Sequence, residues 1–112
     1  MLPKKNRLTK TTDFDRLKKG KKMSAQHVRV FYLPGESEES RIGLIVSKSV
    51  SSNASARNKA KRAIREAIRR IFYQLNGTWD IVVIANPSIA RAYTSDIMND
   101  VEQVFQKSRL LK

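Results

Sequence analysis

The chain of 112 residues has no cysteine and only one histidine, His27. The lack of cysteine excludes disulfides and thiolate metal sites and fits a reducing compartment, so a cytoplasmic protein is expected. A single histidine is too few for a multi-histidine metal site. We therefore assign no metal-ligating residues from the sequence.

Long apolar runs are also missing. No segment approaches the roughly 20 apolar residues that cross a bilayer, and the opening MLPKKNR lacks the apolar centre of a secretory signal. With only 4 glycines and 3 prolines, no low-complexity tail dominates the chain. A hydrophobic content of 40% is enough for one modest core, which predicts a single domain over residues 1–112 and no membrane partner.

Acidic residues are scarce, with 10 Asp and Glu against 23 Lys and Arg, and the net charge is +13. Such an excess repels itself in a folded chain, which favours a polyanionic partner. Nucleic acid is the leading candidate, because neutralising phosphates releases counterions. Most of the basic residues lie in 1–30 and 41–70, whereas acids gather at 36–39 and near the C-terminus. This segregation predicts one positive face for nucleic acid and a near-neutral or negative back.

Apolar periodicity and turn residues predict an α+β fold, a two-layer α/β sandwich. Expected strands lie at 28–33, 42–47 and 79–85, with the first two paired as a hairpin. The strands at 42–47 and 79–85 flank a long helix and form a βαβ unit. The predicted order is α-β-β-(β)-α-β-α, with one further strand left open.

Each of the three helices has a candidate capping residue at its start. The first helix is expected to be capped by Thr12, the long helix by Ser52 or Asn53, and the last helix by Thr94 or Ser95. The long helix is expected to continue to about residue 75.

The long helix divides into two stripes. One stripe is apolar and should pack on the sheet; it consists of Ala60, Ile64, Ala67, Ile68, Ile71 and Leu75. The other stripe is cationic or polar; it consists of Asn58, Lys61, Arg62, Arg65 and Arg69. Like charges at these spacings destabilise a helix, and only Glu66 relieves them. The charge pattern therefore indicates binding to a phosphate-rich partner, for which arginine is well suited.

The residues around this helix resemble a known family. Segments 43–48, 53–54 and 56–66 are similar to the central motif of the bacterial ribonuclease P protein subunit. Segments 2–8 and 80–87 are similar to the opening and the last strand of that family. The resemblance thus covers nearly the whole chain. The chain departs from the family pattern in three ways: Lys59 replaces an arginine, Ser51-Ser52 replaces a glycine, and Lys18 stands where an aromatic residue is frequent.

The resemblance implies an accessory subunit of an endoribonuclease whose catalyst is a large RNA. That holoenzyme hydrolyses a phosphodiester and releases the 5′ leader of precursor tRNA, using Mg²⁺ held mainly by the RNA subunit. The implied partners are the catalytic RNA and precursor tRNA, no obligate protein partner is evident, and the protein alone is not expected to cleave. The resemblance also implies a left-handed βαβ crossover, against the usual right-handed rule.

Two sets of site residues follow from the resemblance. The motif helix and its preceding loop are implied to bind the RNA subunit, through Lys48, Asn53, Arg57, Asn58, Lys59, Lys61, Arg62, Arg65 and Arg69. A cleft between the first helix and the sheet is implied to receive the single-stranded leader, and the residues expected there are Phe14, Lys18, Arg29 and Phe31. Exposed aromatic rings can stack on unpaired bases, although core packing explains Phe14 and Phe31 equally well.

Two other functions fit parts of the sequence. A ribosomal or other structural RNA-binding protein would share the basic α+β composition, but the motif block at 43–66 favours the ribonuclease P family. A self-sufficient protein nuclease would need clustered carboxylates or a histidine base. Most of the acids lie in the 36–39 loop and the C-terminal helix, away from the expected basic face, so this function is disfavoured.

Overall fold

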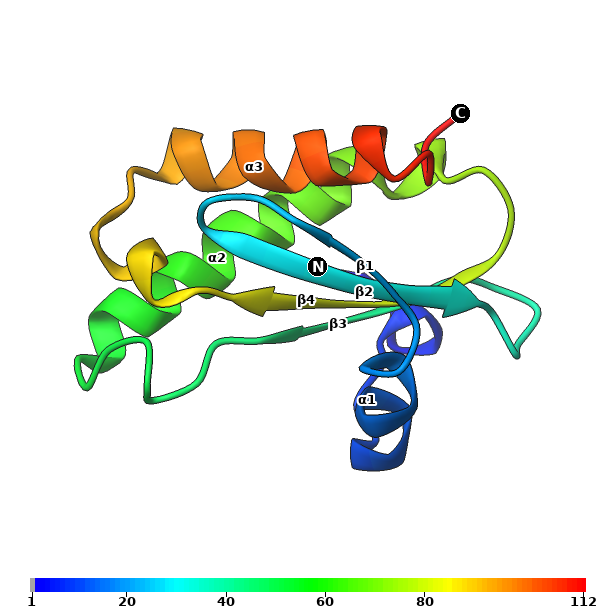
Figure 1. Cartoon of the computed structure of the whole chain (residues 1–112), viewed down its shortest axis with the longest axis horizontal. Coiled ribbons are helices and arrows are strands. Elements are labelled where there is room, and N and C mark those ends of the chain that lie inside the picture. Colours follow the sequence, from blue (N-terminus) through cyan, green and yellow to red (C-terminus); the bar gives the residue numbers. More distant parts are fainter. Residues whose placement is uncertain (1) are drawn as a thin grey trace.

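The computed structural model describes residues 2–112, in which four strands form one mixed sheet (Figure 1). The strands are β1 (Lys21–Ser24), β2 (Val28–Pro34), β3 (Arg41–Ile45) and β4 (Trp79–Ala85). Their order across the sheet is β1-β2-β4-β3, in which β2 is antiparallel to both of its neighbours and β3 is parallel to β4. β4 therefore lies inside the sheet, and its residues after Trp79 are all buried.

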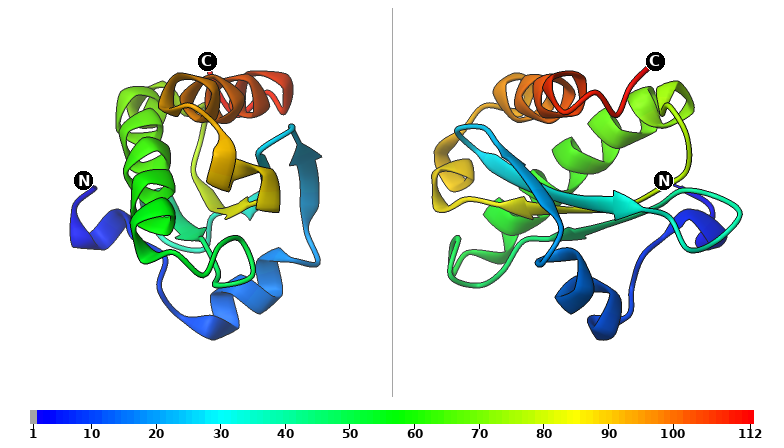
Figure 2. Two further views of the ribbon diagram at one scale, coloured as in Figure 1. Left: turned by 90° about the vertical axis from the view of Figure 1, so that its left-hand side faces the viewer. Right: turned by 45° about the vertical axis from the view of Figure 1, so that its right-hand side comes forward.

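The helices are divided between the two faces of the sheet. α2 (Ala54–Ile71) and α3 (Thr94–Lys107) pack together on one face, whereas α1 (Thr11–Leu17) lies against the other (Figures 1 and 2). Short 3-10 turns complete the fold: η1 (Lys4–Asn6), η2 (Phe72–Gln74) and η3 (Pro87–Arg91). The predicted α+β sandwich is confirmed, with α1 added as a partial third layer.

β2 shows how the sequence pattern positions the two faces. Val28, Val30 and Tyr32 are buried in the core beneath α2 and α3. Phe31 and Leu33 alternate with them and pack in the smaller cluster beside α1. This alternation follows from the strand period of two, and it leaves the face of the sheet beside α1 only partly covered.

α2 buries the predicted apolar stripe; its buried residues are Ala60, Ala63, Ile64, Ala67, Ile68 and Ile71. Asn53 is its N-cap, and the Asn53 side-chain oxygen accepts a hydrogen bond from the Ser55 backbone N–H at 2.8 Å. The helix ends at Ile71, where η2 follows, and the chain is buried again at Leu75. The cap and the stripe are as predicted, although the α-helix is about one turn shorter.

Three predictions about the elements are wrong. The strands at 28–33 and 42–47 are not a hairpin, because β4 lies between β2 and β3. Thr12 does not cap the first helix, since α1 begins at Thr11 after Lys10. Neither Thr94 nor Ser95 caps the last helix, because its N-cap position is Tyr93 and no side-chain cap forms.

The strand left open in the predicted order is β1, on the outer edge of β2. The βαβ unit is confirmed, since β3 and β4 are parallel neighbours joined through α2. The left hand of this crossover stays a prediction.

Candidate nucleic-acid interface

The outward side of α2 carries cations that the protein itself does not neutralise. Arg62 and Arg65 are exposed, and within residues 2–112 neither side chain forms an ion pair or a hydrogen bond. Lys61 lies in the same row and is half-buried. Adjacent like charges at this spacing cost a helix about 0.2–0.5 kcal/mol per pair. The helix holds them because its opposite side is fixed in the core.

Glu66 partly compensates the charge at the C-terminal end of the row, where one carboxylate serves two arginines. Its carboxylate accepts hydrogen bonds from Arg69 Nη2 at 2.6 Å and from Arg70 Nε at 3.1 Å. The hydrogen bond from Arg69 is the main reason that the pKa of Glu66 is lowered to about 2, so the carboxylate is ionised at neutral pH. Within the row, Lys61, Arg62 and Arg65 are therefore the cations that have no carboxylate within ion-pair distance among residues 2–112.

The start of α2 holds its own loop in place. Arg57 Nη1 donates to the Ser51 carbonyl at 2.7 Å, and the Ser51 hydroxyl accepts from the Asn53 backbone N–H at 3.1 Å. The Ser51-Ser52 pair, which departs from the family pattern, is thus part of an ordered turn into the helix. Lys48 and Asn58 remain exposed on either side of this turn.

Lys59 has a structural contact of its own. Its ammonium donates to the Ala92 carbonyl at 3.0 Å, just after η3, and so ties α2 to the segment that leads into α3. All nine residues predicted to bind the RNA subunit lie on α2 or on the loop before it. Four of them also form hydrogen bonds that stabilise the local structure: Asn53, Arg57, Lys59 and Arg69.

The four residues predicted to bind the leader lie on the opposite side of the sheet. Phe14 on α1 and Phe31 on β2 are half-buried and belong to the cluster with Leu17, Val82 and Ile84. Each ring is therefore partly packed and partly exposed. The structure brings the two phenylalanines to one face without burying either completely, which suits a surface that also contacts ligand.

Cations accompany these rings. Lys22 Nζ lies 5.8 Å from the centre of the Phe31 ring, within the range of a cation–π interaction. Arg29 donates from Nη1 to Asn86 Oδ1 at 2.6 Å and is half-buried, whereas Lys18 at the end of α1 is exposed. Lys22 and Asn86 were not predicted as site residues. The register of β1 on β2, which pairs Lys22 with Phe31, is what places this lysine here.

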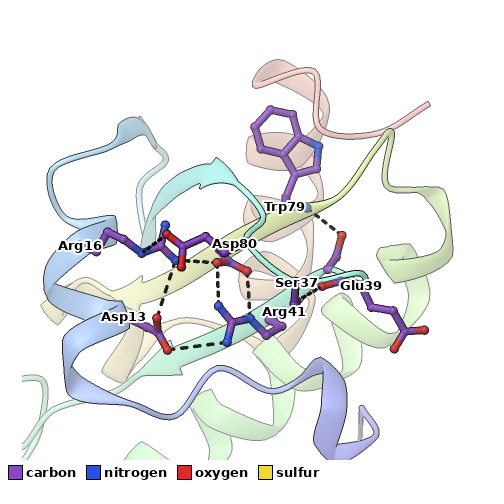
Figure 3. A network of polar contacts seen from close by, with 9 residues as sticks. Asp13, Arg16, Ser37, Glu39, Arg41, Trp79 and Asp80 are labelled. Carbon is purple, nitrogen blue, oxygen red and sulfur yellow. Dashed lines mark hydrogen bonds and ion pairs between the residues drawn. The ribbon is translucent and has the colours of Figure 1, made fainter.

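A buried carboxylate fastens α1 to the sheet (Figure 3). The Asp80 side chain on β4 is 0% exposed and accepts from Arg16 Nη2 at 2.6 Å and from Arg41 Nη2 at 2.8 Å. Asp13 lies 3.8 Å from both arginines. Arg16 and Asp13 come from α1, and Arg41 comes from β3, so the network joins three elements at one end of the open face.

The arginines keep Asp80 ionised. Burial would raise the pKa of Asp80, but the hydrogen bonds from Arg41 and Arg16 outweigh it and hold the pKa below its ordinary value. An acid inside an otherwise apolar strand could have indicated this network from the sequence, because a buried charge needs a partner.

Within residues 2–112, no three His, Cys, Asp or Glu side chains cluster closely enough to hold a metal ion. Both carboxylates of the α1 network, Asp13 and Asp80, already face arginines.

Across residues 2–112, none of the helices has the length and apolar character required to span a membrane.

Comparison with known proteins identifies the relatives of this chain. The family described as Ribonuclease P matches residues 2–109. A ribonuclease P protein component of Thermus brockianus is 36% identical over 99 residues, which cover 88% of this chain and 57% of that protein. The ribonuclease P protein component of Shouchella clausii is 33% identical over 112 residues, covering 98% of this chain and 91% of that protein.

A solved structure agrees with the fold. The RNase P protein of Staphylococcus aureus superposes with a TM-score of 0.86 at 33% identity, over 96% of this chain and 98% of that chain. This chain therefore spans little more than half of the Thermus relative but nearly all of the other two.

Proposed function

The chain belongs to the bacterial ribonuclease P protein family, and from this membership we propose that it is the protein subunit of a ribonuclease P. In this function it binds a catalytic RNA and the 5′ leader of precursor tRNA, and so assists removal of the leader. The RNA performs the hydrolysis, and the protein is an accessory subunit. Family membership does not favour the alternative of a ribosomal or other structural RNA-binding protein.

One observation carries the proposal: Lys61, Arg62 and Arg65 form a row of uncompensated cations on a helix whose other side is locked in the core. The position of the row is fixed by packing, so its charges are held in place before RNA binds. Arginine offers forked donors that match phosphate oxygens. The catalytic RNA is therefore the proposed partner of α2.

The leader is proposed to bind on the other face of the sheet. The half-exposed rings of Phe14 and Phe31 offer stacking surfaces, and Lys18, Lys22 and Arg29 lie on the elements that carry or neighbour them. Stacking on such rings tolerates any base, since every base has a π-face. This separation lets one small domain contact two RNAs at once.

The proposed contribution to catalysis is electrostatic. Two RNAs that approach each other repel, and the protein's cations between them reduce that repulsion. Mg²⁺ supplies the hydrolytic chemistry and is proposed to be held mainly by the RNA, since the described carboxylates form no metal cluster. The protein's own residues bind and orient RNA.

The absence of cysteine fits a reducing compartment, so the proposed location is the cytoplasm.

Salt-dependent binding to the cognate RNA subunit tests the role of α2. Arg62→Ala and Arg65→Ala should each weaken binding and reduce the slope of log K against log salt by about 0.7–0.9, because each removes about one phosphate contact. The matched control is Arg70→Ala, on the same helix but hydrogen-bonded to Glu66, for which we expect a smaller change. Unchanged slopes for both Arg62 and Arg65 variants would contradict the assignment.

A further inference from the structure

A small pocket lies between the N-terminal segment, β3 and α2. Its volume is about 250 Å³. One wall is the chain around Leu8, whose backbone N–H donates to the Ile42 carbonyl at 3.1 Å and so holds the N-terminal segment along the edge of β3. Figure 2 shows this segment beside α2. The pocket is thus formed by elements far apart in the sequence.

The inside of the pocket is apolar. The apolar side chains that line it are Leu2, Leu8, Ile42, Leu44 and Ile68. Leu8, Ile42 and Ile68 are buried, whereas Leu2 and Leu44 are half-buried and keep apolar surface available. The exposed Thr9 adds a hydroxyl that can donate or accept a hydrogen bond.

The charged residues that line the pocket are all cations: Arg7, Lys61 and Arg65. No carboxylate shares the lining. Lys61 and Arg65 belong to the row on α2, so the pocket opens directly beside the proposed RNA surface. Its occupant must therefore combine a negative charge with a flat or compact apolar part.

An unpaired nucleotide has this combination. Its base offers an apolar ring with hydrogen-bonding edges, and its flanking phosphates are anions. RNA-binding proteins take up splayed-out bases in this way. The volume is below the roughly 300–1,000 Å³ of drug-sized ligand sites, which suits one base and not a longer segment.

The pocket wall depends on close approach at Gly43. A Cβ at this position would lie 2.6 Å from the Leu8 carbonyl oxygen and 2.6 Å from Phe14 Cε1. Glycine therefore allows the N-terminal segment and α1 to pack directly on β3. The wall is part of the packed fold and exists without a ligand.

We propose that this pocket receives a single unpaired base of the catalytic RNA, while the phosphates beside that base contact Arg7, Lys61 and Arg65. The inference rests on the proposed function, since it requires α2 to bind that RNA. It adds a base-specific contact to an interface that is otherwise electrostatic, and so gives the interface a defined register on the RNA.

Chemical probing of the bases in the cognate RNA subunit, alone and bound to the intact protein, tests the pocket. We expect an unpaired base to become protected by the wild-type protein. Thr9→Trp and Leu2→Trp, which fill the pocket from two walls without changing charge, should leave that base reactive. Each should raise the Kd for the RNA subunit about tenfold, because the stacked base is lost. The slope of log K against log salt should stay unchanged, because the phosphate contacts remain.

Thr11→Trp is the matched control, because Thr11 is exposed nearby and does not line the pocket. It should protect the base as the wild type does. Thermal unfolding of each variant confirms that the fold is retained. If the wild type binds the RNA but protects no unpaired base, or if both filling variants protect it, the pocket inference is wrong and the proposed function stands. If the wild type does not bind the RNA subunit at all, the proposed function fails.

Discussion

At the scale of single residues, Asp80 is the acidic side chain that holds α1 against the sheet. It is the one buried carboxylate among residues 2–112, and it holds Arg16 of α1 and Arg41 of β3. We expect Asp80→Asn to lower the free energy of unfolding at pH 7 by about 3 kcal/mol, because two arginines lose the charge they surround. Urea unfolding at neutral pH measures this loss.

The same carboxylate predicts a pH dependence. Because the folded-state pKa of Asp80 lies below its unfolded value, its contribution is present above about pH 4 and is lost as the pH falls through the folded-state pKa. Asp80→Asn should therefore show a flatter loss of stability below pH 4 than the wild type. Glu38→Gln is the control, because Glu38 is exposed and forms no ion pair among residues 2–112. Parallel pH profiles of wild type and Asp80→Asn would contradict this role.

Substitution of Phe31 tests whether its ring contacts the leader or only packs in the core. If the ring stacks on the leader, Phe31→Ala should raise the holoenzyme's Kd for precursor tRNA by about 5- to 150-fold, the range of one stacked base, and raise that for mature tRNA much less. Tyr73→Ala is a suitable control, because Tyr73 is 84% exposed at the end of α2, outside the phenylalanine cluster. Equal losses for both tRNAs would assign Phe31 to packing.

At the scale of elements, the cap of α2 links helix stability to the motif loop. Asn53→Ala should lower the free energy of unfolding by about 1 kcal/mol, because the Ser55 N–H loses its acceptor. Asn53→Ser keeps a capping oxygen and should restore most of the stability. Comparing RNA binding by the two variants then separates capping from a direct contact. No loss of stability in Asn53→Ala would contradict the capping role.

Elements with strong periodicity could be predicted from the sequence. The apolar stripe of α2 and the alternation of β2 follow directly from periods of 3.6 and 2. The pairing of β2 with β4 in place of β3 could not be predicted this way, because a short turn-rich loop between two apolar segments is typical of a hairpin. The apolar run at residues 81–85 was the available sequence signal that β4 is a central strand.

β1 was not identified because its residues, Lys21 to Ser24, are mostly charged or exposed. Lysines on an edge strand discourage pairing with other chains. An edge strand of this kind therefore lacks the apolar alternation by which strands are predicted from sequence. Lys22 joined the candidate site only through its pairing with Phe31. The Asp80 network was missed for a related reason: its members are separated by up to 67 positions (13 to 80), and only the fold brings them together.

At the scale of the whole molecule, the net charge of +13 is divided between two surfaces, whereas the sequence predicted one positive face. α2 presents uncompensated cations on one side of the sheet, and α1 with β1 and β2 presents cations and aromatic rings on the other. The acids of the 36–39 loop approach the N-terminal region, where Glu36 lies 3.6 Å from Arg16 and Glu39 lies 3.3 Å from Lys5. This arrangement suits a protein placed between two RNAs.

Cleavage of precursor tRNA at limiting Mg²⁺ tests this account most directly. The cognate RNA subunit is assayed alone, with the wild-type protein, and with an Arg62→Ala, Arg65→Ala double variant, and the protein is also assayed by itself. We predict faster leader removal with the wild-type protein, a smaller gain with the double variant, a benefit that shrinks as Mg²⁺ rises, and no product from protein alone. Equal rates with and without the protein at every Mg²⁺ concentration, or cleavage by the protein alone, would contradict the account.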